Sequence, residues 1–351
     1  MNDIGDVIVA ARLARGLKHL DLVDALGVSQ GALSRYENNL RTPDDAILGK
    51  LGTVLGVTVP FMRHSFRLQG ALAADAHMRR RKSTKASQWR TAEARLNLLR
   101  MRSAFLFERL PMTVDNYVPT FDPGETQPAS AARLVRAQWR MPIGPVRDLT
   151  RWMESAGVLV VEEDMGTQRI DGLSQWAADY PVVMLNSSLS PDRKRLTLAH
   201  ELGHLVLHNT FVDEDLEQQA NDFAAELLMP EHVIAPALRS LTMGRLLELK
   251  GEYGVSMQAV FERAFRMGRV SRDERTKFYR AMNARGWKVE EPGAERVALE
   301  RPRLARLAGE RLREAGLSDS EIAELTGVTD VAHASPFIER TQRHLRTVDR
   351  S

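Results

Sequence analysis

Residues 190–208 of this 351-residue chain read SPDRKRLTLAHELGHLVLH. The Ser-Pro-Asp start and the apolar-rich run behind it predict a helix. His200 and His204 lie four residues apart, and a helix of ~3.6 residues per turn places both imidazoles on one face, where they can bind a single metal ion. The carboxylate of Glu201, beside the first imidazole, then points at the water that the ion activates. This spacing is typical of zinc peptidases and makes Glu201 the predicted catalytic base.

A third ligand is expected on a second helix, because a catalytic zinc takes three protein ligands and keeps one position open. Residues 217–230, EQQANDFAAELLMP, predict that helix. Glu217 is the expected ligand, and Asn221, four residues later, is expected to hydrogen-bond one imidazole from behind and fix its orientation. Two other acids of the segment rank behind Glu217 as ligands: Glu226 and Asp222.

Three other side chains near the motif could have a functional role or could be ordinary surface or packing residues. His208 follows His204 by four residues, but a straight helix carries it one turn past the ion. We therefore expect His208 at the pocket wall or the helix end and not as a ligand. His232 and Tyr180 are alternatives for stabilising an oxyanion, although each is as readily explained as a surface or packing residue.

Around the metal motif, helices and strands are mixed. Two helical segments follow Ala129, and three short apolar runs then predict strands: VLVVEE (158–163), GLSQWA (172–177) and PVVMLN (181–186). Helices dominate after residue 190. The pattern predicts an α+β zincin-like metallopeptidase domain over 129–240 with a helical extension over 241–295. An extended substrate could add to an exposed edge of the small sheet.

The N-terminal part predicts a different, all-α domain over 1–66. Residues 21–38, DLVDALGVSQGALSRYEN, place two helices around a Gly-Val-Ser turn with Ser29 as N-cap, as in a helix-turn-helix. The second helix of such a unit lies in the major groove, which puts Gln30, Ser34 and Arg35 toward the bases of double-stranded operator DNA. The alternative is a helical bundle used for dimerisation without DNA.

Charge is concentrated in one segment. The chain has a net charge of +3, but residues 79–102 carry nine Lys and Arg against Glu93 alone, while residues 1–66 are neutral. We predict a basic, partly helical linker over 67–128 that supplies the phosphate attraction the neutral domain lacks. The alternative is a solvated helix face or a tether.

The charged tail, 296–351, predicts helices. Its patch LSDSEIAELTGVTD, residues 317–330, looks like half of another helix-turn-helix, and we interpret it as a capping helix pair. We find no internal repeat of long period.

Composition limits the chemistry and the compartment. The chain has no cysteine, which excludes disulfides, thiolate metal sites and a cysteine nucleophile, so any metal must be held by His and carboxylate. No stretch approaches ~18 consecutive apolar residues, and the start of the chain lacks a secretory signal. We therefore expect no membrane partner and a cytoplasmic protein, associated with the nucleoid when bound to DNA.

The N-terminal domain resembles the lambda-repressor-like helix-turn-helix of the XRE family. The matching residues are Gly27-Val28-Ser29-Gln30, Ser34 to Glu37, Arg41-x-Pro43 and Leu51 to Val57. Lys18-His19 replaces the Thr-Gln that is usual before the second helix. The resemblance implies a lambda-repressor-like fold, operator DNA as partner and a homodimer over two half-sites.

The later segments LNSSLSPDRKRLTLAHELGHLVLH and EQQANDFAAELLMPEHV resemble the ImmA/IrrE family of metallopeptidases. The resemblance begins near Ala131 and continues to Glu291-Pro292. It implies Zn²⁺ bound by the two motif imidazoles and Glu217, with Glu201 as base. Gln219 stands where the family often has a second acid. Family members target DNA-binding repressors for cleavage, and some carry an XRE-type helix-turn-helix in front.

Together these features predict a DNA-binding transcriptional regulator that is also a zinc-dependent site-specific endopeptidase. Its expected substrate is a repressor protein in a stress, prophage or mobile-element response, and self-cleavage ranks below cleavage of a partner. The alternative is a transcription factor whose peptidase-like domain senses a ligand or metal without proteolysis. A purely structural zinc fits poorly, because structural sites usually close with four ligands.

Overall fold

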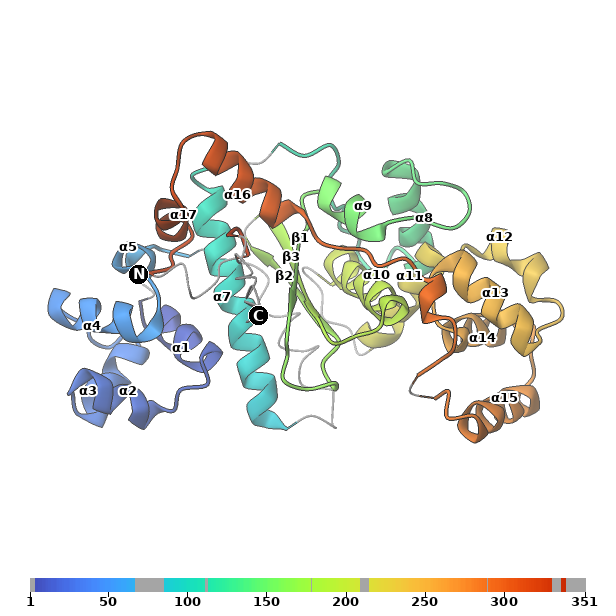
Figure 1. Ribbon diagram of the computed structural model, residues 1–351, viewed down its shortest axis with the longest axis horizontal. Coiled ribbons are helices and arrows are strands. Elements are labelled where there is room, and N and C mark those ends of the chain that lie inside the picture. Colours follow the sequence, from blue (N-terminus) through green and yellow to red (C-terminus); the bar gives the residue numbers. More distant parts are fainter. Residues whose placement is uncertain are drawn as a thin grey trace, which may run out of the picture. The chain divides into compact units, whose positions relative to one another are not determined.

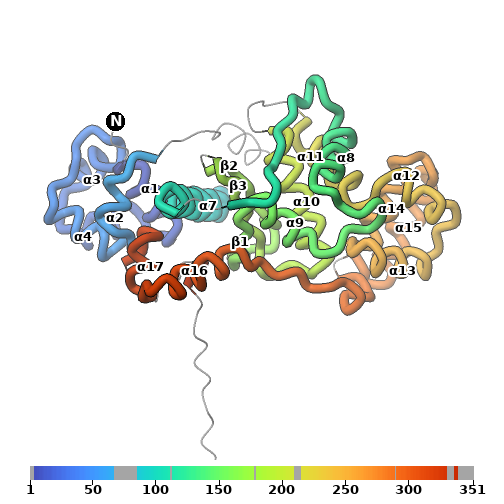
Figure 2. The backbone as a smooth tube through the Cα atoms, turned by 90° about the horizontal axis from the view of Figure 1, so that it is seen from above, coloured from blue at the N-terminus to red at the C-terminus, as the bar shows by residue number. Residues whose placement is uncertain are grey.

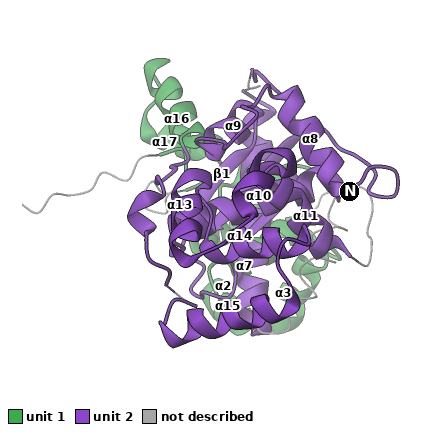
Figure 3. Cartoon of the chain, turned by 90° about the vertical axis from the view of Figure 1, so that its right-hand side faces the viewer, with its two compact units in different colours: residues 1–65, 303–351 green, residues 66–302 purple. Residues whose placement is uncertain are grey.

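The computed structural model describes residues 4–66, 85–110, 113–177, 179–208, 215–288, 290–329 and 336–338. The chain divides into two compact units (Figures 1 and 3). Residues 1–65 and 303–351 form unit 1, and residues 66–302 form unit 2. Within the described ranges, no helix has both the length and the apolar character needed to cross a membrane.

Unit 1 begins with five helices, as the sequence predicts for a helix-turn-helix bundle. They are α1 (Ile4–Ala14), α2 (His19–Leu26), α3 (Gln30–Glu37), α4 (Asp45–Leu55) and α5 (Val59–Arg63). The Ser29 Oγ accepts a hydrogen bond from the backbone N of Ala32 at 3.2 Å, which confirms the predicted N-cap of α3. Leu22, Leu26 and Leu33 are buried between the helices. The all-α part of the fold prediction is therefore confirmed.

Two polar contacts hold α3 against α1. Arg12 donates from Nε and Nη2 to the two carboxylate oxygens of Glu37, at 2.6 and 3.1 Å. The backbone N of Gly5 donates to Asn39 Oδ1 at 2.7 Å, and a Cβ at Gly5 would lie 2.5 Å from the carbonyl oxygen of Tyr36. A larger residue than glycine would push α1 away from the end of α3. The contacts thus fix the helix that is predicted to enter the major groove.

Two helices from the far end of the sequence complete unit 1. They are α16 (Leu304–Glu314) and α17 (Asp319–Leu325). Ser318 caps α17 by accepting from the backbone N of Glu321 at 3.3 Å. Residues 304–329 nevertheless follow the pattern of residues 4–29: α16 and α17 begin 300 positions after α1 and α2, and glycines of positive φ occupy the corresponding turns. The two copies share few identical side chains, which is why a sequence comparison alone overlooks them.

Unit 2 contains a small three-stranded sheet made of the three predicted strands. They are β1 (Leu159–Glu163), β2 (Gly172–Ala177) and β3 (Tyr180–Asn186). The strand order is β1-β3-β2, with β1 parallel and β2 antiparallel to β3. The central strand β3 is apolar from Val182 to Leu185 and buried on both faces, as a strand covered by helices must be. β1 and β2 are the edges.

Helices cover both faces of the sheet (Figure 2). One side carries α8 (Pro128–Gln138), α9 (Leu149–Ser155), α10 (Pro191–Leu207) and α11 (Leu216–Leu228). The other side carries α7 (Ala86–Phe107), which packs on β2 and β3. The Phe107 ring lies 4.9 Å from the Tyr180 ring. Part of the segment predicted as a linker thus belongs to this unit, and its basic residues 79–84 lie outside the described residues.

Further helices extend unit 2, which confirms its mixed α/β character. They are α12 (Glu231–Ile234), η1 (Ala235–Leu238), α13 (Met243–Tyr253), α14 (Met257–Arg266), α15 (Arg272–Ala284) and η2 (Ala294–Arg296). Buried Lys250 on α13 donates to Asp192 Oδ2 at 2.8 Å and to Glu291 Oε2 at 3.2 Å. Burial opposes ionisation of Asp192, but hydrogen bonds from Lys250 and Ser190 outweigh it and lower the pKa of this carboxyl. The start of α10 is thereby anchored to the extension.

Candidate metal centre

A glycine on α10 allows the two helices of the site to approach closely. A Cβ at Gly203 would lie 3.1 Å from the Ala220 Cα and 3.2 Å from the Ala220 carbonyl oxygen on α11. These are backbone atoms, so a side chain at this position would separate the helices. Glu217 precedes Ala220 by three residues on the same helix. The close approach at Gly203 therefore brings Glu217 to the helix that carries the two histidines.

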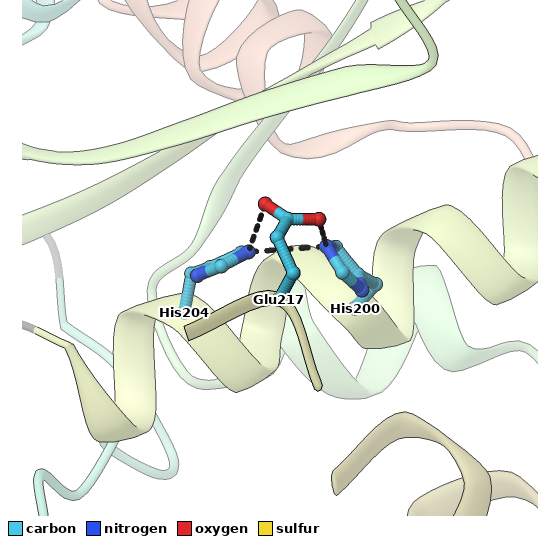
Figure 4. A group of neighbouring side chains, drawn as sticks. All are labelled: His200, His204 and Glu217. Carbon is cyan, nitrogen blue, oxygen red and sulfur yellow. Dashed lines mark hydrogen bonds and ion pairs between the residues drawn. The ribbon is translucent and has the colours of Figure 1, made fainter. Parts of the chain in front are cut away.

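His200, His204 and Glu217 converge (Figure 4). The Nε2 atoms of the two imidazoles are 3.0 Å apart. One carboxylate oxygen of Glu217 lies 3.6 Å from the His200 Nε2, and the other lies 3.8 Å from the His204 Nε2. The two imidazoles are buried, whereas the Glu217 side chain is 31% exposed. The imidazoles and the Glu217 Oε1 are thus enclosed by protein, while another part of the Glu217 side chain reaches solvent.

The donor set fits a divalent metal ion. Two donors at ~2.1 Å from a tetrahedral ion are ~3.4 Å apart. The imidazole nitrogens are 3.0 Å apart, and each lies 3.6 or 3.8 Å from a different oxygen of Glu217. Imidazole nitrogen and carboxylate oxygen are both zinc ligands. Three protein donors leave one tetrahedral position vacant, which is characteristic of catalytic sites and not of structural ones. In the part of the chain that is described, no other group of three metal-ligating side chains converges in this way.

Asn221 orients the first imidazole. The His200 Nδ1 lies 3.1 Å from the Asn221 Oδ1, one helical turn after Glu217. An amide oxygen only accepts hydrogen bonds, so the proton resides on Nδ1 and the Nε2 lone pair faces the site. This is the arrangement that a metal-binding imidazole requires. The structure places Asn221, the predicted partner of one of the two imidazoles, beside His200.

A relay of two side chains orients the second imidazole. The His204 Nδ1 lies 2.9 Å from the His208 Nδ1, and the His208 Nε2 lies 2.8 Å from the Gln219 Oε1. Because the Gln219 oxygen accepts, His208 carries its proton on Nε2 and accepts at Nδ1. His204 then carries its proton on Nδ1, and its Nε2 lone pair faces the site.

The sequence predicts His208 at the pocket wall or the helix end, but its contact with His204 is not predicted. His208 is indeed the residue that ends α10, and it is 1% exposed. The signal lay in two spacings: His208 follows His204 by one helical turn, and Gln219 follows Glu217 by two residues. Neither spacing reveals that the two side chains meet.

Glu201 is held by the sheet. Its side chain is buried, and Glu201 Oε2 accepts a hydrogen bond from the Ser174 Oγ on β2 at 2.7 Å. A Cβ at Gly172, on the same strand, would lie 2.7 Å from the Thr197 Cγ2 and 3.3 Å from the Glu201 Cγ. β2 therefore approaches α10 closely at a glycine and orients the carboxylate with a serine. Nothing in the local sequence marks Ser174, because its role depends on where the strand packs.

The rival residues lie elsewhere. Glu226 is buried and forms ion pairs with Arg263 and Arg133. Asp222 points to the surface and pairs with Arg266 at 2.6 Å. Neither joins the convergent group in the described part of the chain. His232 is exposed on α12, and Tyr180 packs on the Phe107 ring.

The residues predicted to contact DNA share one surface of α3. Gln30, Ser34 and Arg35 are all exposed, while Leu33 and Tyr36 on the same helix are buried. This alternation is what a helix needs in order to pack on α1 and α2 and still present polar side chains to a ligand. The placement agrees with the predicted orientation of the second helix of a helix-turn-helix.

Comparison with protein families assigns both parts of the chain. Residues 8–62 match the helix-turn-helix family, and residues 153–265 match the IrrE N-terminal-like domain. This chain joins a helix-turn-helix domain to an IrrE N-terminal-like domain. The radiation response metalloprotease IrrE of Deinococcus radiodurans is 40% identical over 74 residues, which cover 17% of this chain and 23% of that protein. The chain thus matches about a quarter of the length of this relative.

A cavity of about 500 Å³ in the IrrE-like domain includes Asn221, the hydrogen-bond partner of His200, in its lining. Thr197 and Asn221 line it, so it lies on the side of His200 that faces Asn221. Buried Lys250 and Glu291 line its far wall together with Met229. The cavity therefore shares Asn221 with the surroundings of the candidate site and has both apolar and charged lining residues.

Loss of the relay in the IrrE-like domain is expected to weaken metal binding without abolishing it. Removing an outer hydrogen-bond partner of a metal ligand typically costs about 10–100-fold in affinity. We expect this loss in His208→Ala and in Gln219→Leu, measured by titration against a competing chelator. Gln219→Glu keeps an acceptor for His208 and should bind metal nearly as the wild type does. His232→Ala removes an exposed histidine and serves as the control; an equal loss there would contradict the relay.

Proposed function

We propose that this chain is a DNA-binding transcriptional regulator and a zinc-dependent endopeptidase that cleaves a repressor protein in a stress, prophage or mobile-element response. The observation that carries the proposal is the convergence of His200, His204 and Glu217 beside the buried carboxylate of Glu201. The similarity of residues 153–265 to the IrrE N-terminal-like domain supports the same reading. The helix-turn-helix match supports DNA as the second partner and hence a cytoplasmic, nucleoid-associated protein.

In the proposed mechanism, each residue of the site has a separate task. His200, His204 and Glu217 would hold a zinc ion, which would supply Lewis-acid chemistry for peptide hydrolysis at this place. Glu201 takes the proton of the attacking water and passes it to the leaving amine. Ser174 holds the carboxylate of Glu201 in place for both proton transfers. Asn221, like the relay behind His204, keeps an imidazole nitrogen directed into the site.

The sheet offers a place for an extended substrate. β2 is an edge strand, and its Ser174 contacts Glu201, so a peptide added along that edge runs past the base. Strand addition binds through main-chain hydrogen bonds and requires an extended, accessible segment. A flexible linker in a DNA-binding repressor meets that requirement. The adjoining cavity can then receive a substrate side chain and provide selectivity.

The second reading is a transcription factor whose peptidase-like domain senses a ligand or metal. Sensing a ligand or metal does not require a buried carboxylate beside the first imidazole, and it does not require a serine that orients this carboxylate. The contact between Ser174 and Glu201 therefore favours the peptidase. The cavity beside Asn221 is the feature that suits a sensor.

Cleavage that depends on metal tests the proposal. The purified full-length chain, loaded with zinc, is incubated with proteins extracted from its host, and new N-termini are identified by mass spectrometry. We expect them in a DNA-binding repressor, and we expect none when a chelator is in excess. Cleavage that persists in the chelator would contradict the metal site. Loss of the chain's own helix-turn-helix domain would identify self-cleavage instead.

Base contacts from α3 predict a specific loss of DNA affinity. Arg35→Ala and Gln30→Ala should each cost about 1–3 kcal/mol on a DNA site selected from a random pool, measured at one fixed salt concentration. Arg15→Ala removes the same charge as Arg35→Ala from a position outside α3 and serves as control. An equal loss in Arg15→Ala would show that charge, and not base recognition, governs the affinity.

A further inference from the structure

Unit 1 contains an incomplete second copy of its own first half. Helix α16 begins 300 positions after α1 and has the same 11-residue length, and α17 begins 300 positions after α2. Both copies turn through glycines of positive φ, at Gly16 and Gly316 (70° and 94°) and again at Gly27 and Gly327 (68° and 74°). We call residues 304–329 the half-repeat.

The agreement extends to individual hydrogen bonds. In the turn after the first helix, Leu17 N donates to Arg12 O at 3.0 Å, and Leu317 N donates to Leu312 O at 3.1 Å. At the start of the second helix, Lys18 N donates to Asp21 Oδ2 at 2.7 Å, and Ser318 N donates to Glu321 Oε2 at 2.8 Å. The half-repeat therefore has the geometry of the first two helices of a helix-turn-helix.

The half-repeat ends in a tripeptide that also occurs between α4 and α5. Gly327-Val328-Thr329 and Gly56-Val57-Thr58 are identical in sequence. Val57 and Val328 form an antiparallel bridge, and both are buried. The backbone N of Thr58 donates to the Gly327 carbonyl at 3.0 Å, and the backbone N of Thr329 donates to the Gly56 carbonyl at 3.4 Å.

This pairing is symmetric. Exchanging the two tripeptides converts each hydrogen bond into the other, so the contact has a local two-fold axis. Both glycines have positive φ, 69° at Gly56 and 74° at Gly327, so the two backbones also bend alike. A surface that pairs with an identical sequence about a two-fold axis is self-complementary, as the interface of a homodimer must be. Residues 56–58 of a second chain thus offer the donors, acceptors and side chains that residues 327–329 offer here.

We propose that residues 56–58 form an edge through which two copies of this chain pair, and that the half-repeat closes this edge within one chain. The contact within one chain competes with pairing between chains because both segments belong to the same molecule, so their effective concentration does not depend on the protein concentration. The full-length chain is therefore monomeric through this edge, and release of the half-repeat permits a dimer that presents two copies of α3. The inference concerns unit 1 alone and does not depend on the peptidase activity.

Two glycines provide ways to release the half-repeat. A Cβ at Gly327 would lie 2.2 Å from the ring of Phe61 on α5, and one at Gly309 would lie 1.8 Å from the carbonyl oxygen of Phe337. Gly327→Val acts at the edge, and Gly309→Val acts inside the half-repeat at a distance from it. Gly316→Ala is the matched control, because its φ is also positive but no atom lies within 4 Å of the added Cβ.

The experiment uses the full chain, which has no cysteine, so Val57→Cys adds a single thiol at the edge. Under oxidising conditions we expect chains with Val57→Cys, alone or with Gly316→Ala, to remain monomeric. Adding Gly327→Val or Gly309→Val should give a disulfide-linked dimer, and sedimentation should show a twofold increase in mass. Equal cross-linking in every variant would overturn the proposal, because the edge would then be open without release. Absence of dimer in both release variants would overturn it as well.

Discussion

Glu201→Gln is expected to retain bound metal and to lose proteolysis, with the cleavage rate lower by about 10²–10⁴-fold. The amide is nearly isosteric with the carboxylate and can still accept from Ser174, so the side chain stays in place. It cannot take a proton from water at neutral pH. The measurements are the initial rate of appearance of the new N-termini and the metal content per chain. A structural role for Glu201 would instead change both quantities together.

The control for this variant is Glu231→Gln, which neutralises an exposed acid of the same unit. It should cleave at the wild-type rate. Undiminished proteolysis by Glu201→Gln would show that a group other than Glu201 acts as the base. A variant that loses metal as well as activity would show that the carboxylate supports the fold of the site.

His204→Ala is expected to lose the metal ion. The variant keeps two of the three donors and also loses the hydrogen-bond relay through His208. Its affinity for the metal should therefore fall by more than the roughly 10–100-fold expected when only a hydrogen-bond partner of a ligand is removed. Wild-type protein should hold one ion per chain by elemental analysis, and the variant should hold none after dialysis. Zinc should be the metal that the wild type retains.

Metal binding should also appear as stability. A ligand that binds the folded state alone stabilises it by about 4.1 kcal/mol at a thousand times its dissociation constant. Zinc should therefore raise the unfolding temperature of the wild type and leave that of His204→Ala unchanged. His208→Ala should show an intermediate rise, and His232→Ala the full one. Retention of one tightly bound ion by His204→Ala would contradict the proposed ligand set.

The spacing of residues along the chain was sufficient to predict several features of the fold and the site. The four-residue spacing of His200 and His204 places them on one face of α10, because the hydrogen-bond pattern of a helix repeats within a few residues. The same reasoning located the N-cap at Ser29 and the three strands of the sheet. These features depend on neighbours along the chain, so the sequence contains what is needed to find them.

Which of several acids on one helix joins the candidate metal site depends on how distant segments pack. Glu217 and Glu226 share a helix, and the sequence ranks them without separating them in space. Gly203 lets α11 approach where Glu217 meets the imidazoles, while Glu226 is turned toward two arginines. Ser174 gives no sequence signal, since its contact with Glu201 exists only because β2 packs on α10.

The sequence by itself determined that this chain has a helix-turn-helix followed by a metal motif whose two imidazoles lie on one face of a helix. Tertiary structure decided which acid joins them, which side chains fix their protons, and that residues 304–329 pack on a helix bundle some 300 positions earlier. The physical reason is range. Backbone hydrogen bonding sets periodicity over a few residues, whereas the meeting of distant segments depends on complementary shape and burial, which no local pattern encodes.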